Sequence, residues 1–240
     1  MKKTHGPRMK EPQYQFLLKL REKEGLRQLG LMTSQLYRDD PKHLVFQLSR
    51  YKFAAKMLSG LKNVLEVGCG DGFSTKLIRQ EVSHVTGIDF DPVFIEASRA
   101  LHGTERGMEF FVWDICKDGP RKEKYNGIFS CDVIEHIPKE QENRFLRNIV
   151  LSLAPEGVFL CGTPSLASQA YASPPSRQGH VNCKDALALK KLMLRHFRNV
   201  FIFSMNDEVV HTGFYSMAHY LLPFAVDPKN RLSARYRLVF

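Results

Sequence analysis

Long apolar runs are missing from this chain of 240 residues. A membrane-spanning helix needs about 20 consecutive apolar residues, and no stretch of the sequence approaches that length. The basic N-terminus lacks the apolar segment and the cleavage site of a signal peptide, so none is predicted. With 43% hydrophobic and 25% charged residues, the composition predicts a soluble globular protein without a membrane span.

Cysteines are few and follow no pattern. The chain has five, an odd number, and no two of them form a Cys-x-x-Cys pair. A disulfide framework is therefore not predicted, and the spacing of a zinc knuckle is absent. Cysteines of this kind are typical of proteins kept in a reducing compartment, and we expect a cytoplasmic location.

The positive charge is not uniform, although the formal net charge is +10. Residues 1–62 carry 14 basic and 5 acidic side chains, residues 63–226 carry 17 and 19, and residues 227–240 carry 4 and 1. We therefore predict a basic N-terminal region over 1–62, a near-neutral domain over 63–226 and a basic C-terminal tail over 227–240. A basic end can bind phosphates, so nucleic acid stays an alternative partner that the near-neutral domain does not favour.

Short apolar runs alternate with amphipathic segments from residue 63 onward. The runs cover residues 63–67, 84–89, 108–113, 127–131, 157–163, 199–205 and 216–225, and helices are predicted over 74–82, 92–101, 139–153 and 184–197. Unbroken apolar runs are typical of strands covered on both faces by crossover helices. We predict an α/β fold with a seven-stranded, mostly parallel sheet. Its last strand is antiparallel, because no helix separates the last two runs, and helices over 14–30 and 43–58 form an N-terminal cover.

A glycine-rich turn follows the first predicted strand, in the segment Glu66-Val-Gly-Cys-Gly-Asp-Gly-Phe73. Glycines let a ligand approach the backbone closely. A dinucleotide fingerprint needs a further glycine where Phe73 stands, and a P-loop needs Gly-Lys-Ser/Thr, which is absent. The turn therefore disfavours a dehydrogenase or a nucleoside triphosphatase.

Two aspartates end the next two strands. Asp89 lies 17 residues after Gly72, the position from which a carboxylate can accept both hydroxyls of a ribose. Asp114 follows Trp113 at the end of the third strand, where a base could lie. The carboxyl ends of parallel strands meet at one edge of a sheet, so the sequence predicts a nucleoside-type site there.

The ordered motifs resemble the class I S-adenosylmethionine-dependent methyltransferases. They are LEVGCGDG, GIDFDP, Trp-Asp at 113–114, FSCDVIEHIP and LAPEGVFLCGTPS, and the resemblance covers about residues 44–225. It implies a Rossmann-like fold with an antiparallel last strand, S-adenosylmethionine as cofactor and methyl transfer as the activity. The implied cofactor-binding residues are Arg50 for the carboxylate, Glu66, Gly68, Cys69, Gly70 and Gly72 around the methionine, Asp89 and Phe90 at the ribose, Asp114 and Ile115 at the adenine, and Cys131. We assign no chemistry to the two cysteines.

Three histidines follow later strands and are candidates for proton transfer. A hydroxyl acceptor benefits from a general base, and histidine suits neutral pH. We expect His180, in a long segment after the fifth strand, to be the base, with His136 as the second candidate. His211 lies between the last two strands. With it, an acceptor pocket is predicted from Tyr171, Arg177, Asn182, Asp207 and Glu208.

A metal site is a further interpretation of one of these motifs. The run Asp132-Val-Ile-Glu135-His136 is similar to that of ubiquinone-pathway O-methyltransferases, in which two acids and the histidine are associated with a divalent metal. Asp132 stands where a glutamate is usual, and the pair Glu135-His136 also suits a helix cap. We do not expect a metal.

The acceptor is predicted to be a small molecule, methylated on a hydroxyl. The Asn/Asp-Pro-Pro-Tyr/Phe arrangement that grips a planar amino group is absent after the fourth strand. The alternatives are an RNA or protein methyltransferase that uses the basic N-terminal region for docking, and a cofactor-binding protein without catalysis. The sequence does not determine the oligomeric state.

Overall fold

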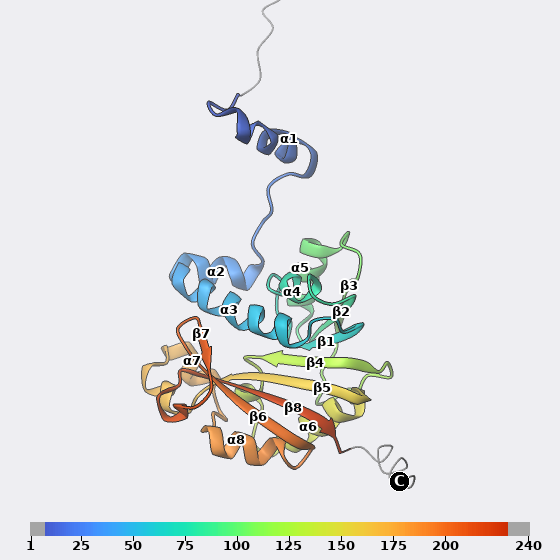
Figure 1. The fold of residues 1–240 in the computed structure, drawn as a ribbon, viewed down its shortest axis with the longest axis vertical. Helices are drawn as coiled ribbons and strands as arrows, with labels where there is room; N and C mark the ends of the chain where they lie inside the picture. Colours follow the sequence, from blue (N-terminus) through green and yellow to red (C-terminus); the bar gives the residue numbers. More distant parts are fainter. Residues whose placement is uncertain (1–7, 230–240) are drawn as a thin grey trace, which may run out of the picture.

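An eight-stranded sheet forms the centre of the protein in a computed structural model that describes residues 8–229 (Figure 1). The strand order is β3-β2-β1-β4-β5-β8-β6-β7. Pairs among β1 to β5 are parallel, whereas β8 is antiparallel to both β5 and β6. The strands are β1 (Asn63–Val67), β2 (His84–Asp89), β3 (Met108–Val112), β4 (Tyr125–Cys131), β5 (Leu153–Pro164), β6 (Phe197–Asn206), β7 (Val209–His211) and β8 (Tyr220–Pro228).

The predicted α/β class, the mostly parallel sheet and the antiparallel pairing of the last two apolar runs are confirmed. The sheet has one strand more than the seven expected. The additional strand, β7, has three residues and pairs antiparallel with the end of β6. Three residues are too few to show an alternating pattern of apolar and polar side chains, and β7 directly follows the polar turn at Asp207 and Glu208.

Helices cover both faces of the sheet, as the crossover connections require. Those with eight or more residues are α1 (Gln15–Glu24), α2 (Leu31–Asp39), α3 (Pro41–Met57), α5 (Pro92–His102), α6 (Glu142–Ser152) and α8 (Ala186–Met193); α4 (Thr75–Arg79) and α7 (Pro174–Gly179) are shorter. Successive strand residues point to opposite faces. On β4, Ile128 packs in the apolar cluster that holds α6 and α8, and Phe129 packs in the cluster that holds α3 and α4.

Local signals explain where the long helices begin. Asp40 caps α3 by accepting a hydrogen bond from the backbone N–H of Lys42, and Asp91 caps α5 in the same way through Val93. A proline follows each cap and suits the first turn of a helix. The helix predicted over 43–58 is therefore confirmed and begins slightly earlier, at Pro41. Helices α2 and α7 were not predicted, although Ser173 and Pro174 give α7 the same cap and proline.

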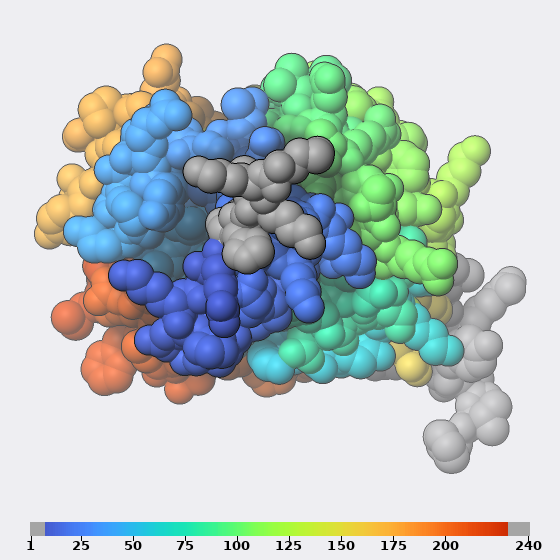
Figure 2. Space-filling view, turned by 90° about the horizontal axis from the view of Figure 1, so that it is seen from above, coloured from blue at the N-terminus to red at the C-terminus, as the bar shows by residue number. Residues whose placement is uncertain are grey.

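The N-terminal region contains two very different parts. α1 has no buried residue, and it projects from the rest of the molecule on an extended segment over 25–30 (Figure 1). Seen from above, the N-terminal residues therefore lie in front of the other elements (Figure 2). α3 instead contributes Tyr51, Ala54, Ala55 and Leu58 to the core. The predicted boundary at residues 62 and 63 stays a prediction, although α3 packs as part of the same core as β1.

Two short stretches lie outside the described residues, namely 1–7 and 230–240. Most of the predicted basic C-terminal tail therefore falls outside them. Between residues 8 and 229, none of the helices combines the length and the apolar character needed to cross a bilayer.

Candidate functional site

The glycine-rich turn after β1 is held tightly against the end of β2. The backbone N–H groups of Gly68 and Cys69 both donate to the carbonyl of Ile88, at 2.8 and 3.1 Å. Gly68, Gly70 and Gly72 have φ values of +78°, +53° and +71°, which glycine adopts without strain. A Cβ on Gly68 would lie 2.2 Å from a methyl carbon of Val133, so the turn has room for backbone only.

Asp89 lies beside this turn at the end of β2. Its carboxylate accepts the N–H of Gly70 and the N–H of Asp91, each at 3.0 Å. The side chain is buried, and desolvation raises its pKa. The carboxylate is thus fixed by backbone donors beside the buried glycine turn, and its contact with the ribose of S-adenosylmethionine stays a prediction.

Glu66 ends β1 beneath the turn and is fully enclosed. One carboxylate oxygen accepts the Tyr51 hydroxyl at 2.7 Å and the other accepts the Thr75 hydroxyl at 2.5 Å. Burial raises the pKa of Glu66 to about 8, against the lowering effect of these two hydrogen bonds. Both oxygens are therefore occupied within the protein, and Glu66 shapes the turn from below.

Asp71 plays a part that the sequence analysis missed. Its carboxylate accepts the backbone N–H of Thr33 at 2.7 Å and the Thr33 hydroxyl at 3.1 Å, so it caps α2 from another segment of the chain. Gly30 packs directly on Asp71, and Met32 lies over Gly70. The second helix therefore closes over the glycine turn. The only signal in the sequence was an aspartate within that turn.

The remaining predicted cofactor residues lie along the same edge but differ in exposure. Asp114 caps the turn that follows β3 by accepting the N–H groups of Cys116 and Lys117. Ile115 is buried and Phe90 is exposed. Cys69 and Cys131 are buried, and burial raises the pKa of each thiol. The contacts of these residues with the cofactor stay predictions.

Arg50 is buried on α3 and faces the end of β4. Its guanidinium donates to Asp132 at 2.7 Å and lies over the rings of Phe46 and Tyr220. Burial alone would lower the pKa of Arg50, but Asp132, Tyr220 and Cys131 together outweigh this effect and raise it. The Nε atom of Arg50 has no hydrogen-bond partner. Its predicted contact with the cofactor carboxylate stays a prediction, because its observed partner is Asp132.

His136 and His180 come together after β4 and β5, with ring centroids 5.0 Å apart. Nδ1 of His136 is 2.9 Å from the carbonyl oxygen of Gly179, and Nδ1 of His180 is 2.8 Å from Oε1 of Gln169. Burial, and next the neighbouring His136, lower the pKa of His180. The two rings are thus held from one side, and the neutral form of His180 is favoured.

Glu135 lies next to this pair and is completely buried. Its Oε2 accepts the Thr163 hydroxyl at 3.1 Å, whereas Oε1 has no hydrogen-bond partner. Burial raises the pKa of Glu135 to about 8. Ligand-capable atoms of Glu135, His136 and His180 all lie within 4.8 Å of one another, so these three side chains could hold a metal ion. Asp132, the other weak candidate, is not part of this group and pairs with Arg50 instead.

The predicted acceptor residues are spread around this edge. Tyr171 and Arg177 are exposed on the segment after β5, and Asp207 and Glu208 are exposed at the turn between β6 and β7. Asn182 is tied to the chain by donating to Ile137 and Glu142. His211 lies on β7 with its ring 6.1 Å from that of Phe214. Whether these residues line an acceptor pocket stays a prediction.

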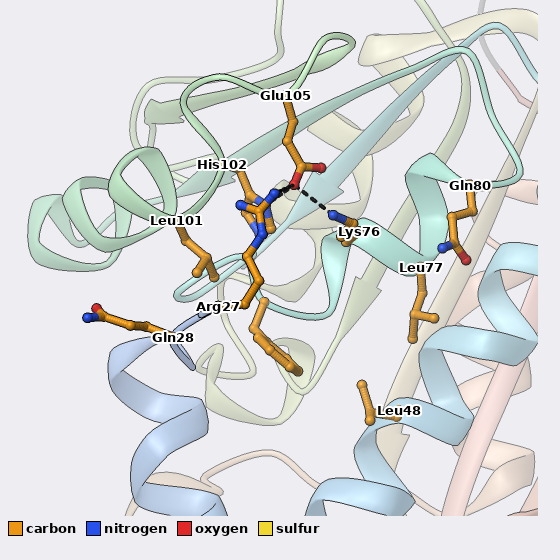
Figure 3. Close-up of a pocket in the computed structure, with 10 residues that line it drawn as sticks. Arg27, Gln28, Leu48, Lys76, Leu77, Gln80, Leu101, His102 and Glu105 are labelled. Atoms are coloured by element: carbon orange, nitrogen blue, oxygen red, sulfur yellow. Dashed lines mark hydrogen bonds and ion pairs between the residues drawn. The ribbon is translucent and has the colours of Figure 1, made fainter. Parts of the chain in front are cut away.

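A separate pocket of about 260 Å³ opens behind the glycine turn, between the segment before α2 and helices α3, α4 and α5 (Figure 3). Leu48, Leu77 and Leu101 line it, and Glu105 pairs with Lys76 at 2.7 Å on its rim. His102 connects it to the site, because its Nε2 lies 2.9 Å from the carbonyl of Gly72. None of the predicted site residues lines this pocket.

The fold and this edge together define a class of protein. A glycine turn after β1, an acid after β2 and an antiparallel strand β8 inserted next to β5 are the features of class I S-adenosylmethionine-dependent methyltransferases. Residues 64–157 match the family model described as a methyltransferase domain. Over residues 64–157 the chain is therefore similar to a methyltransferase domain, and its fold is the one on which such domains bind S-adenosylmethionine.

Relatives of known name agree with this assignment but match only parts of the chain. The ubiquinone biosynthesis O-methyltransferase of Rickettsia bellii is 26% identical over 137 residues, 57% of this chain and 55% of the relative. That of Xylella fastidiosa is 34% identical over 86 residues, 34% of this chain and 33% of the relative. The chain thus aligns with about half or less of the length of these relatives.

Solved structures show the same fold. The N-methyltransferase NodS from Bradyrhizobium japonicum, solved in complex with S-adenosyl-L-homocysteine, superposes with a TM-score of 0.58 at 20% identity, covering 80% of this chain and 91% of NodS. The methyltransferase domain of a bacterial Hen1 superposes with a TM-score of 0.63 at 14% identity, over 75% of this chain and 98% of that domain. A carbon methyltransferase, CurJ, is also similar, with a TM-score of 0.59. These neighbours differ in the atom they methylate, so the fold does not define the acceptor.

Proposed function

We propose that the protein transfers a methyl group from S-adenosylmethionine to a hydroxyl of a small molecule and that a histidine accepts the proton of that hydroxyl. The observation that carries the proposal is the His136–His180 pair, whose Nδ1 atoms are both held by oxygen atoms of the chain. The names of the ubiquinone biosynthesis relatives support a hydroxyl as the acceptor atom.

S-adenosylmethionine supplies a methyl group on a positively charged sulfur. The chain's own task is to bind and orient the two reactants, since positioning provides most of the acceleration in such transfers. The glycine turn, Glu66 and Asp89 would hold the donor at the ends of β1 and β2. α2, docked on Asp71, would exclude water from that side.

The acceptor hydroxyl would lie at the ends of β4 and β5. A bond forms between its oxygen and the methyl carbon, the bond from that carbon to sulfur breaks, and S-adenosylhomocysteine leaves. The hydroxyl proton passes to Nε2 of His180, with His136 as the second candidate. A neutral His180 is ready to accept it, because burial lowers its pKa.

Calorimetry and a transfer assay test this function. Titration of the full chain with S-adenosylhomocysteine should show binding, and titration with NAD should show none. Isotopically labelled S-adenosylmethionine, offered with a panel of substituted phenols, should yield labelled methyl ethers. Binding of NAD alone would overturn the proposal, and labelled amines instead of ethers would overturn the choice of acceptor atom.

Two neighbouring aspartates provide a matched pair for the cofactor side. Asp89→Ala should weaken S-adenosylhomocysteine binding by about 100-fold, on the scale of two lost charge-assisted hydrogen bonds. Asp91→Ala removes only the cap of α5 and should leave this affinity within about twofold, with a loss of roughly 1 kcal/mol in unfolding free energy. Equal affinities of both variants would remove Asp89 from the cofactor site.

An RNA or protein acceptor is the alternative, and the basic N-terminal region supports it. Residues 1–62 carry 14 basic against 5 acidic side chains. Phosphate contacts release counterions, so RNA binding would weaken steeply with salt.

We place the protein in the cytoplasm, in keeping with its five free cysteines.

A further inference from the structure

The three side chains Glu135, His136 and His180 have lone pairs left over in the folded protein. A carbonyl oxygen only accepts hydrogen bonds, so the contact with Gly179 requires a proton on Nδ1 of His136. In the neutral ring, Nε2 of His136 then carries a bare lone pair. No hydrogen bond from this Nε2 is formed within residues 8–229.

His180 is held in the same tautomer by a side-chain amide. The NH₂ group of Gln169 points toward the carbonyl of Ser165, 3.4 Å away, so its Oε1 faces His180 and accepts from Nδ1 at 2.8 Å. Nε2 of His180 is therefore also bare. Oε1 of the fully buried Glu135 is the third atom without a partner.

The three side chains converge at one place, and Nε2 is the nitrogen that each ring has left for a ligand, because Nδ1 is already bonded. One ligand-capable atom from each of Glu135, His136 and His180 lies within 4.8 Å of the other two. Each side chain is fixed from behind, by Thr163, the Gly179 carbonyl and Gln169 respectively. Outer-shell partners of this type orient the ligands of metal sites in proteins.

The donor set selects the kind of ion. Two imidazole nitrogens and one carboxylate are typical of three-ligand zinc sites, whereas Mg²⁺ prefers oxygen ligands. An oxygen-rich site would need Asp132, the first acid of the motif that resembles the ubiquinone-pathway enzymes. Asp132 is instead paired with Arg50 at 2.7 Å. His180, from a segment more than 40 residues away, takes the third position.

We infer that Glu135, His136 and His180 form a binding site for a zinc-type transition-metal ion, and that an ion bound there prevents proton transfer to the histidines. The second part follows because a metal ion and a proton compete for the same Nε2 lone pairs. That part rests on the proposed function, whereas metal binding does not.

Metal binding is tested with the full chain, freed of metal by a chelator and titrated with Co²⁺ alone while its visible absorption is recorded. One Co²⁺ per chain should bind, Zn²⁺ should displace it, and Mg²⁺ in the same concentration range should not. His136→Ala and His180→Ala should weaken Co²⁺ binding by at least about 100-fold, and Gln169→Ala by about 10-fold through loss of ring orientation.

Two control variants separate this site from its rivals. His84→Ala removes a histidine that pairs with Glu109 at the opposite edge of the sheet and should leave Co²⁺ binding unchanged. Asp132→Asn keeps an oxygen for Arg50 and should also leave it unchanged. Unweakened Co²⁺ binding by His180→Ala, or displacement of Co²⁺ by an equal concentration of Mg²⁺, would overturn the site. Since His180→Ala changes a partly exposed residue, its folding can be checked by its melting temperature.

Inhibition is measured separately, by methyl transfer to a phenol in chelator and in saturating Zn²⁺. The rate should fall by at least about 10-fold with Zn²⁺ and recover when chelator is added. A rate that rises with Zn²⁺ would contradict both the competition between metal ion and proton for Nε2 and the role of a metal-free histidine as the base. If no phenol is methylated under any condition, the proposed function and the inhibition fail, while the Co²⁺ titration still decides the metal site.

Discussion

Two buried glutamates illustrate the difference between the two halves of the active edge. Burial raises the pKa of both Glu66, on β1, and Glu135, after β4, to about 8. Glu66 has both oxygens occupied by the hydroxyls of Tyr51 and Thr75, whereas Oε1 of Glu135 has no partner. Both oxygens of Glu66 are therefore used within the fold, whereas Oε1 of Glu135 is available to a ligand.

The same contrast extends to the surroundings of each acid. At the ends of β1 and β2 the polar groups satisfy one another, mostly through backbone. Around β4, β5 and β8 lie five of the seven buried side-chain atoms without a hydrogen-bond partner in residues 8–229, on Arg50, Ser130, Glu135, His211 and Tyr220. Buried polar atoms are rarely left unpaired without a reason. We call the glycine turn, Glu66 and Asp89 at the ends of β1 and β2 the cradle, because their polar groups already have partners. The region around β4, β5 and β8 has unpaired polar atoms that a ligand could use.

The largest expected effect comes from breaking the contact between the halves. Gly68→Ala places a Cβ 2.2 Å from Val133 at a φ of +78°, so both strain and overlap should lower the unfolding free energy by about 4 kcal/mol. Gly60→Ala is the matched control, with a φ of +81° and open space around it, and should cost about 1 kcal/mol. Denaturant unfolding measures both. Similar losses for the two variants would show that the halves are not packed tightly at Gly68.

The burial of Glu66 in the cradle is tested by the pH dependence of the unfolding free energy. The pKa of Glu66 is about 8 in the folded protein and 4.5 as its ordinary value, so the folded state binds the additional proton between these pH values. Its stabilising contribution is complete below about pH 4.5 and is lost as the pH rises through 8, by an amount on the order of 5 kcal/mol. Glu66→Gln should flatten this part of the curve of unfolding free energy against pH. Glu96→Gln, which changes an exposed acid on α5, should keep the wild-type curve, and an unchanged curve for Glu66→Gln would contradict the prediction.

The proposed role of His180 in proton transfer is tested by His180→Ala, measured in the presence of a chelator. Turnover should fall by about 100-fold, the usual contribution of a general base, and the affinity for S-adenosylhomocysteine should stay within about twofold. Because His180 makes no contact with the glycine turn, Glu66 or Asp89, the variant should lose turnover without losing affinity for S-adenosylhomocysteine. A parallel loss of cofactor affinity would mean that the halves act as one unit, and unchanged turnover would remove His180 from the mechanism.

The sequence identifies the glycine turn more readily than the contacts between distant segments, for a physical reason. Gly68, Gly70 and Gly72 act through local backbone geometry, which a motif on one turn encodes. Asp71, Arg50 and Gln169 act on partners 38, 82 and 11 residues away, and only the folded chain brings each pair together. For this reason the cap on α2, the Arg50–Asp132 pair and the tautomer of His180 were not foreseen. The three-residue strand β7 was missed because it is too short for any periodicity.

The smallest effect is expected at the N-terminus, which neither half uses. α1 is joined to α2 by an extended segment, and residues 8–24 include no buried side chain, so we expect that deletion of residues 1–24 leaves the core intact. The melting temperature should change by less than about 1 °C, and methyl transfer to phenols should be unaffected. Deletion of residues 1–40 is the comparison, because it also removes the Thr33 contact with Asp71 and should weaken cofactor binding. Loss of a salt-dependent association with RNA in the shorter deletion would support the alternative that the N-terminal region docks RNA. A lower rate of methyl transfer to phenols would contradict the prediction and would show that α1 contributes to the active site.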